Sequence, residues 1–148
     1  SCKPSAMKVN EIIPLEGENG FPVPFFDMGV AAGDPSYVSM PFQSTININE
    51  ELIRNKKSTF CVRVAGQSMI DAGIDDGDLL IVDRELEPQN NNVVLAVING
   101  DYTVKRLYKN GAELFLQPAN KNYSPIRITQ FMDFRLWGVV TGVIKKLI

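Results

Sequence analysis

From Thr59 onward, short runs of alternating apolar and polar residues are separated by Gly, Asn and Asp. This period of two residues is typical of half-buried β-strands, and the Asn-Gly pairs at 99–100 and 110–111 are typical of tight hairpin turns. A mostly β, compact antiparallel fold with short helices is therefore predicted. The expected strands are 59–64, 79–82, 93–98, 102–108, 113–116, 126–128 and 135–144.

Two short helical segments are expected beside these strands. Asn47 or Asn49 can cap a helix over 50–54, whose first turn is acidic, as the helix dipole favours. Residues 68–72 are expected to form roughly one further helical turn, which Gly73 ends.

The first 42 residues have a different character. They are rich in proline and glycine and show no sustained helical or strand period. Such a segment has little apolar surface to bury and is expected to be an extended, flexible N-terminal arm. We therefore expect two parts, the arm at 1–42 and a β domain at 43–148.

The chain of 148 residues contains no histidine, which limits its chemistry. Ser-His-Asp and Cys-His catalysis and zinc sites built on imidazole are excluded. Acid–base chemistry would need a lysine, a carboxylate, a tyrosine or a cysteine. The net charge of −2 argues against strong intrinsic affinity for DNA or for anionic membranes.

Cysteine usage and hydropathy indicate a cytoplasmic protein. The two cysteines, Cys2 and Cys61, cannot form a disulfide framework, and Cys61 lies in an apolar run where burial is expected. No secretory signal is visible, and the late apolar run 136–144 is interrupted by glycine and threonine. We expect no membrane association and no cofactor.

Two polar residues stand in unusual surroundings. Ser68 follows Gly66 between a strand and a helical turn, where backbone N–H groups can bind an oxyanion. Lys105 shares one strand face with Thr103 and Leu107, so its surface is expected to be partly buried. Taken singly, each has an ordinary alternative: a helix-capping serine and a lysine that reaches solvent along a strand edge.

Together, the two segments resemble the LexA/UmuD family of self-cleaving Ser/Lys peptidases (the S24 type). The resemblance is carried by Gly-Gln-Ser-Met at 66–69, Gly-Ile-Asp-Asp-Gly-Asp at 73–78 and Thr-Val-Lys-Arg-Leu at 103–107. It covers about residues 31–148 and implies the C-terminal β fold of that family. One departure is Asn91-Asn92, where many members have Gly-Asp.

The resemblance implies a role for each site residue. Ser68 is the expected nucleophile and Lys105 the general base, with the backbone N–H groups of Gln67 and Ser68 as the oxyanion hole. Thr103 is a candidate to orient the amine because it shares the strand face of Lys105, and not because of the resemblance. Because an ordinary lysine has a pKa of about 10.4, Lys105 must be desolvated to act as a base at neutral pH.

The resemblance also implies that the substrate lies in the same chain. The expected cleavage site is Ala32–Gly33, because Ala-Gly is a scissile pair in the family and its spacing to Ser68 is close to the family's. Asn19–Gly20 is a rival, although it lies farther from Ser68 than the usual register. The small residues around Ala32 would equally suit a plain linker.

Within the family, the short arm before the cut favours UmuD. That resemblance implies a homodimer that joins a Y-family polymerase subunit (UmuC-like) in translesion synthesis, is stimulated by a RecA–ssDNA filament and makes no direct sequence-specific DNA contact. One alternative is the C-terminal self-cleaving regulatory domain of a LexA-like or phage-type transcriptional repressor. Another is an interaction module without activity.

The remaining charged clusters have ordinary explanations. The acidic run 71–78 superficially resembles a calcium loop, but Gly73 and Asp76 stand where such a loop needs a ligand and a glycine. We therefore expect no metal site and assign these acids to turns. The lysine pairs at 56–57 and 145–146 are expected to be solvated.

Overall fold

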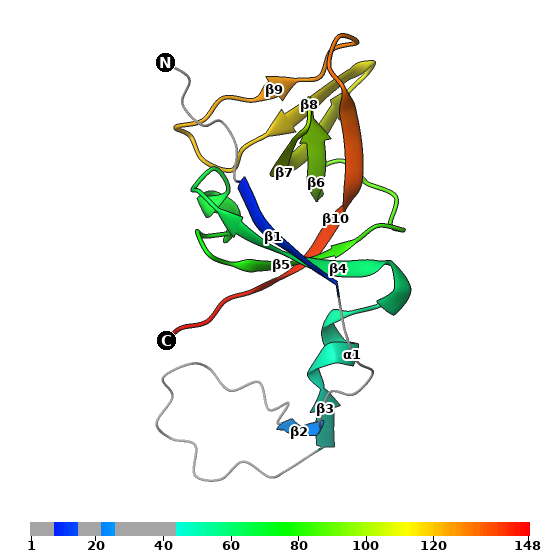
Figure 1. Ribbon diagram of the computed structural model, residues 1–148, viewed down its shortest axis with the longest axis vertical. Coiled ribbons are helices and arrows are strands. Elements are labelled where there is room, and N and C mark those ends of the chain that lie inside the picture. The colour runs from blue at the N-terminus through cyan, green and yellow to red at the C-terminus, as the bar shows by residue number, and fades with distance from the viewer. Residues whose placement is uncertain (1–7, 15–21, 26–43) are drawn as a thin grey trace. The chain divides into compact units, whose positions relative to one another are not determined.

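A computed structural model describes residues 8–14, 22–25 and 44–148 (Figure 1). The chain divides into two compact units, one of Ser1–Leu15 with Asn55–Ile148 and the other of Glu16–Arg54. The larger unit carries an eight-stranded sheet, and the smaller one a two-stranded sheet and a helix. The arm predicted at 1–42 and the β domain predicted at 43–148 stay a prediction.

The elements of the larger unit are β1 (Lys8–Pro14), η1 (Lys56–Ser58), β4 (Thr59–Ala65), η2 (Ile70–Ala72), β5 (Leu79–Asp83), β6 (Val93–Ile98), β7 (Asp101–Asn110), β8 (Glu113–Gln117), β9 (Ile126–Arg127) and β10 (Phe134–Ile144). Those of the smaller unit are β2 (Pro22–Phe25), β3 (Ser44–Asn47) and α1 (Ile48–Leu52). The predicted mostly β fold with short helices is confirmed. No helix within the described residues is long and apolar enough to cross a bilayer.

The large sheet has the strand order β1-β4-β5-β10-β6-β7-β8-β9, and neighbouring strands are antiparallel. The long strand β10 joins its two halves, because Phe134–Val139 pair with β6 and Val139–Ile144 pair with β5 (Figure 1). Bulges interrupt the register between Leu136 and Gly138 and between Val140 and Gly142. A bulge bends a strand, which allows one strand to serve two halves.

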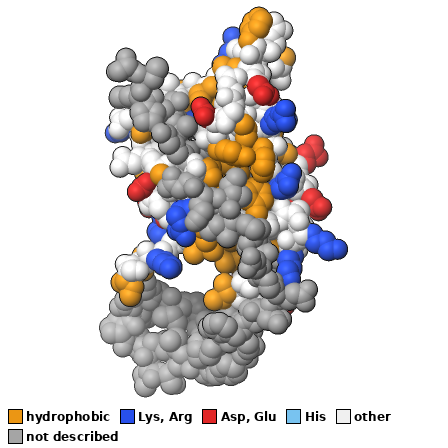
Figure 2. Space-filling model, in the orientation of Figure 1, with side chains coloured by type: hydrophobic (Ala, Val, Ile, Leu, Met, Phe, Trp, Pro, Cys, Tyr) orange, Lys and Arg blue, Asp and Glu red, His pale blue; other side chains and the backbone are white. Residues whose placement is uncertain are grey.

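Two hydrophobic clusters form the core. Cys61 is buried at 5% exposure, as expected, and carries a free thiol. On the face shown in Figure 2, charged side chains of both signs surround a central area of hydrophobic side chains. The first cluster contains Phe60, Val62, Val64, Met69, Ile74, Leu80, Val82, Leu95 and Val104, and the second contains Val94, Ala96, Leu107, Leu116 and Val139.

The predicted Asn-Gly turn at 99–100 is confirmed. The turn predicted at 110–111 is displaced by one residue, because Asn110 still pairs with Glu113 and Gly111 (φ 62°) begins the turn. Asn99 and Gly100 both have positive φ (50° and 88°), the geometry of the hairpin turn that favours Asn-Gly. Asn47 caps α1, since its side-chain oxygen accepts hydrogen bonds from the backbone N–H groups of residues 49 and 50 at 3.0 and 3.4 Å. Gly73 ends η2 in the left-handed conformation (φ 79°).

One strand of the large sheet was not predicted. Residues 8–14, which belong to the expected arm, form β1 and pair antiparallel with β4. A further pairing joins β2, also in that arm, to β3. The local pattern of side chains does not predict β1. Its backbone groups form hydrogen bonds with the edge of β4, which lies far away in the sequence, and this pairing leaves no local signal.

Replacing Gly138 by alanine is expected to destabilise the fold by roughly 1–3 kcal/mol. A Cβ at this position would lie 2.6 Å from Val82 Cγ1 and 2.9 Å from the backbone oxygen of Asp83. The matched control is Gly142→Ala, whose nearest neighbour, Ile81 Cδ1, lies at 3.3 Å on a side chain that can shift. Denaturant unfolding measures both variants, and equal losses would contradict the close approach at β10.

Candidate functional site

Ser68 lies in the turn between β4 and η2, which we call the nucleophile turn (residues 66–71). The end of β4 is held by backbone bonds: the Val64 N–H donates to the Asp78 carbonyl (3.0 Å), and the Gly77 N–H donates to the Val64 carbonyl (2.8 Å). Gly66 then turns the chain with a φ of 106°. The backbone thus places Ser68 without using its hydroxyl.

The Ser68 side chain is fully buried, with 0% exposure. Among the described residues, its Oγ has no hydrogen-bond partner. The next residue, Met69, is also fully buried and belongs to the first hydrophobic cluster. A buried hydroxyl without a partner costs free energy, and such exceptions are found where a group is kept for chemistry.

Lys105 lies in the middle of β7 and is also fully buried. In the sheet register it stands opposite Val94, and Leu107 lies two residues along on the same strand face; both are fully buried. Burial lowers the pKa of Lys105 from 10.5 to about 8. At pH 7 about one amine in ten would then be neutral, which is several hundred times the fraction for an ordinary lysine.

Thr103 shares that environment. Its side chain is 3% exposed, and within the described part of the chain its Oγ1 has no hydrogen-bond partner. Thr103 pairs with Ala96 and Lys105 with Val94, so both belong to the same strand face, as the period of two predicts. A role in orienting the amine stays a prediction.

The segment that begins at the last residue of β8 (residues 117–123) contacts both β7 and the nucleophile turn. We call it the linking turn. Arg106 pairs with Gln117, so continuing this register places Pro118 beside Lys105. The next residue, Ala119, accepts a hydrogen bond from the Asp71 N–H at 2.7 Å. The backbone near Ser68 and the backbone near Lys105 therefore both lie beside the linking turn.

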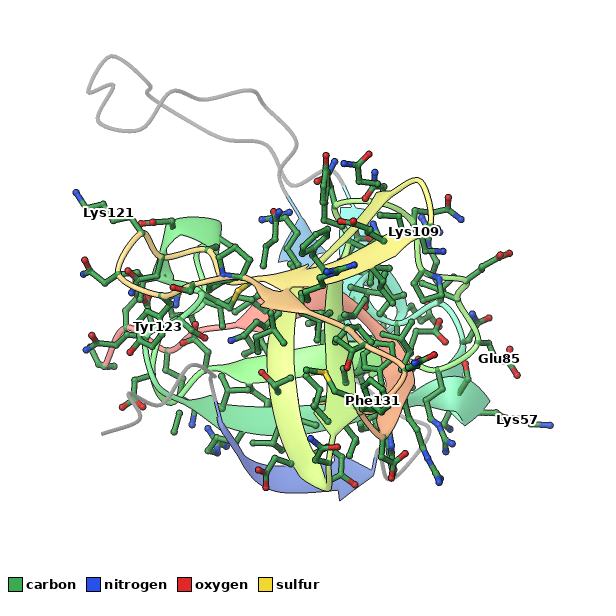
Figure 3. All side chains as sticks on the ribbon, turned by 90° about the horizontal axis from the view of Figure 1, so that it is seen from above. Lys57, Glu85, Lys109, Lys121, Tyr123 and Phe131 are labelled. Carbon is green, nitrogen blue, oxygen red and sulfur yellow. The ribbon has the colours of Figure 1, made fainter. Side chains whose placement is uncertain are left out.

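An open hollow of about 380 Å³ lies beside the linking turn and reaches Asp71 of the nucleophile turn. The side chains of Lys121 and Tyr123 lie near each other at one edge of the view in Figure 3, with Lys121 extended outward. The lining residues are Asp71, Gln117, Pro118, Ala119, Asn120, Lys121, Tyr123 and Pro125.

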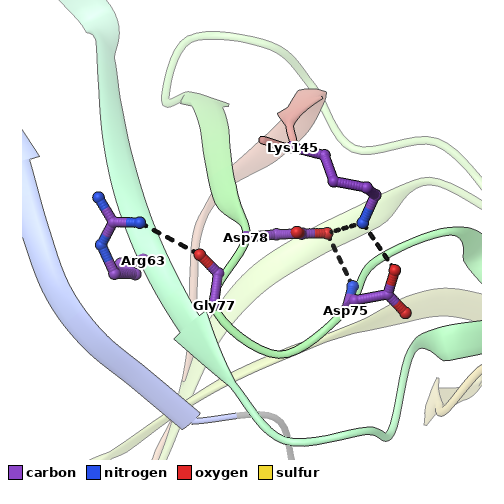
Figure 4. Close-up of polar contacts among 5 residues, drawn as sticks. All are labelled: Arg63, Asp75, Gly77, Asp78 and Lys145. Atoms are coloured by element: carbon purple, nitrogen blue, oxygen red, sulfur yellow. Dashed lines mark hydrogen bonds and ion pairs between the residues drawn. The ribbon is translucent and has the colours of Figure 1, made fainter. Parts of the chain in front are cut away.

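The acidic residues after Gly73 form turns, as the sequence predicts. The Asp75 N–H donates to Asp78 Oδ2 (2.8 Å), and the Gly66 N–H donates to Asp76 Oδ1 (2.9 Å). Lys145 is exposed, as expected, and its Nζ contacts Asp78 and lies 2.7 Å from Asp75 Oδ2 (Figure 4). Hydrogen bonds to Asp75 and Asp78 raise the pKa of Lys145.

Comparison with known proteins places the chain in a family. The sequence profile described as Peptidase S24-like matches residues 24–141, and the chain belongs to this family. A LexA repressor of Clostridium novyi (strain NT) is 33% identical over 148 residues, 99% of this chain and 70% of that protein.

Two further relatives are also LexA repressors. That of Alteromonas mediterranea is 39% identical over 140 residues, covering 90% of this chain and 65% of the relative. That of Desulfatibacillum aliphaticivorans is 34% identical over 120 residues, covering 80% and 59%. The chain thus spans between 59% and 70% of the length of these three relatives.

These comparisons confirm the predicted LexA/UmuD-type family, and they leave the choice of UmuD within it unconfirmed. The named relatives are LexA repressors, so the preference for UmuD and for a UmuC-like polymerase partner is not supported. The roles of Gln67, Ser68, Thr103 and Lys105 stay predictions. The expected cleavage site, Ala32–Gly33, lies outside the described residues.

Sequence reasoning missed one polar residue at the site, Asn120. Its side chain is 6% exposed and donates from Nδ2 to the Gln67 carbonyl at 2.7 Å. Its position in a Pro-Ala-Asn-Lys-Asn run indicates only a turn. The contact joins residues 53 positions apart, so no local pattern signals it.

Replacing Lys105 by methionine is expected to stabilise the fold at pH 7 by about 1–3 kcal/mol. Between pH 8 and 10.5 the unfolded chain holds the lysine proton more tightly than the folded one, so wild-type stability rises with pH across that window. The stabilisation should therefore shrink as the pH approaches 10.5. Denaturant unfolding at pH 7 and pH 10.5 measures it.

The matched control is Lys109→Met, an exposed lysine farther along β7 (Figure 3). Its effect on the free energy of unfolding should be small and nearly the same at both pH values. An equal, pH-independent effect of the two methionine variants would contradict a desolvated Lys105.

Proposed function

We propose that this chain is the self-cleaving regulatory part of a LexA-type repressor, in which Ser68 is the nucleophile and Lys105 the general base. The bond cleaved is Ala32–Gly33. The observation that carries the proposal is a fully buried lysine whose pKa burial lowers to about 8, in a fold that also buries a serine hydroxyl with no partner among the described residues. Membership of the Peptidase S24-like family supports it.

The proton transfers and the bond changes involve the two side chains, the cleaved peptide bond and water. Neutral Lys105 removes the proton of Ser68 Oγ while that oxygen attacks the carbonyl carbon of Ala32. The tetrahedral intermediate then breaks its C–N bond, and the lysine ammonium delivers the proton to the Gly33 nitrogen. Water hydrolyses the acyl-serine ester with Lys105 again as base, which restores the enzyme.

The oxyanion of the intermediate requires hydrogen-bond donors. The backbone N–H groups of Gln67 and Ser68 are the proposed donors. Among the described residues neither donates a hydrogen bond, which supports this assignment. Donors held by a rigid backbone need no reorganisation when the charge develops.

Cleavage of the chain's own peptide bond does not require an efficient peptidase, because tethering supplies a high effective concentration of substrate. The rate then depends on how often the cleavable segment occupies the site, an equilibrium that a partner can shift. We propose the RecA–ssDNA filament as that partner and a homodimer as the working form. Cleavage would separate the regulatory part from the segment preceding it, as expected for a repressor of the SOS response.

An accessory subunit of a translesion polymerase, as in UmuD, is the second candidate. It is supported by Gly20-Phe-Pro-Val-Pro24, which looks like the sequence after the UmuD cut. The named relatives favour the repressor. The natural reading frame distinguishes the two: three short helices encoded upstream identify a repressor, and a short arm alone identifies the polymerase subunit.

Self-cleavage is expected to accelerate as the pH rises and to reach half its maximal rate near pH 8, because the base must be neutral and the pKa of Lys105 is about 8. The product should begin at Gly33. Rates are measured by gel densitometry between pH 6 and 10.5, and the new N-terminus by mass spectrometry.

Ser68→Ala and Lys105→Ala should each abolish cleavage, and Lys109→Ala should leave it unchanged. Wild-type cleavage in the Lys105 variant would exclude this lysine as the base. A fragment that begins at Gly20 would move the cut to the rival bond. An uncleaved wild-type protein at every pH would favour an inactive interaction module.

A further inference from the structure

Asn120 is a buried polar residue to which the cleavage chemistry gives no role. It belongs to the linking turn, and its side chain is 6% exposed. Its Nδ2 donates to the carbonyl of Gln67 at 2.7 Å, across from the residue immediately before the nucleophile. The contact joins the linking turn, which follows β8, to the nucleophile turn, which follows β4. The nucleophile turn is therefore held by a segment distant in the sequence as well as by its own backbone bonds.

The direction of the Asn120 amide is set by a second hydrogen bond. Its Oδ1 accepts from the backbone N–H of Asn122 at 3.0 Å. A flipped amide would place an N–H donor against that N–H and an oxygen against the Gln67 carbonyl, and would lose both bonds. The donor therefore faces Gln67.

Two neighbouring bonds reinforce the same attachment. The Ala119 N–H donates to Met69 Sδ at 3.2 Å, and the Ala119 carbonyl accepts from the Asp71 N–H at 2.7 Å. Residues 67, 69 and 71 of the nucleophile turn are thus each bonded to the linking turn. Asn120 makes the contact nearest to the oxyanion donors.

The planarity of the peptide bond gives this contact a consequence for catalysis. In a trans peptide the carbonyl of Gln67 and the N–H of Ser68 point in opposite directions. Anchoring the carbonyl to Asn120 therefore turns the Ser68 N–H away from the linking turn. The carbonyl also accepts from the Ile70 N–H, at the longer distance of 3.3 Å, which by itself holds the plane less firmly.

We propose that Asn120 is a positioning residue that orients the Ser68 N–H as an oxyanion donor by holding the peptide plane between Gln67 and Ser68. The inference rests on the proposed function, since it assumes an oxyanion at Ser68. Losing the contact would weaken stabilisation of the tetrahedral intermediate and would leave the pKa of the base unchanged.

Self-cleavage of Asn120→Asp and Asn120→Ala tests this role across pH. The aspartate keeps the shape but has no N–H to donate, and the alanine removes the contact. Each should lower the maximal rate roughly 10- to 100-fold, less than the loss expected for a missing oxyanion donor. In Asn120→Ala the pH of half-maximal rate should stay at the wild-type value. Both variants should remain folded, with an unfolding temperature lowered by the loss of a buried hydrogen bond. Lys109→Ala, an exposed residue of β7 outside the site, is the control and should cleave normally.

Other outcomes overturn the inference. A wild-type maximal rate in both variants excludes the role. A shifted pH midpoint in Asn120→Ala, or loss of folding in both variants, makes the contribution of Asn120 structural rather than catalytic. The proposed function is tested separately in the same series, because it fails when the wild-type protein is uncleaved, or when Ser68→Ala or Lys105→Ala is still cleaved.

Discussion

The desolvation of one amine is the constraint on which the proposed chemistry depends. Lys105 lies in β7 between β6 and β8, with buried Val94 opposite it, and has no access to water. Lowering its pKa from 10.5 to about 8 corresponds to roughly 3 kcal/mol of disfavoured charge. An apolar residue would be more stable there, so the position is explained better by reactivity than by stability.

Ser68 is positioned by hydrogen bonds of the backbone around it. Turn 75–78 binds the end of β4, and the linking turn binds the nucleophile turn from another side. Because these bonds use backbone groups and Asn120, they leave the Ser68 hydroxyl without a partner among the described residues. Lys145 and Asp78 fasten the first of these turns to the chain just after β10.

How much the sequence could predict depended on the range of each interaction. The strand before Ser68 and the hairpin at Asn99-Gly100 were predicted correctly, because alternation and turn chemistry are local. Strand β1 was missed because it depends on the distant edge of β4, and Asn120 because it bonds across 53 positions. The alternation of residues along β7 predicted that Lys105 shares a strand face with Thr103 and Leu107. Its complete burial was not predictable, because it depends on how β7 pairs with β6.

The central claim is that Lys105 gives up its proton near neutral pH inside the folded protein. Its most direct test is an NMR titration of the Lys105 side-chain Cε and Hε resonances in the uncleavable Ser68→Ala protein, with Lys109 as an internal reference. A midpoint near pH 8 for Lys105 is the result expected from its burial. A midpoint near the ordinary lysine value of about 10.4 would contradict the account.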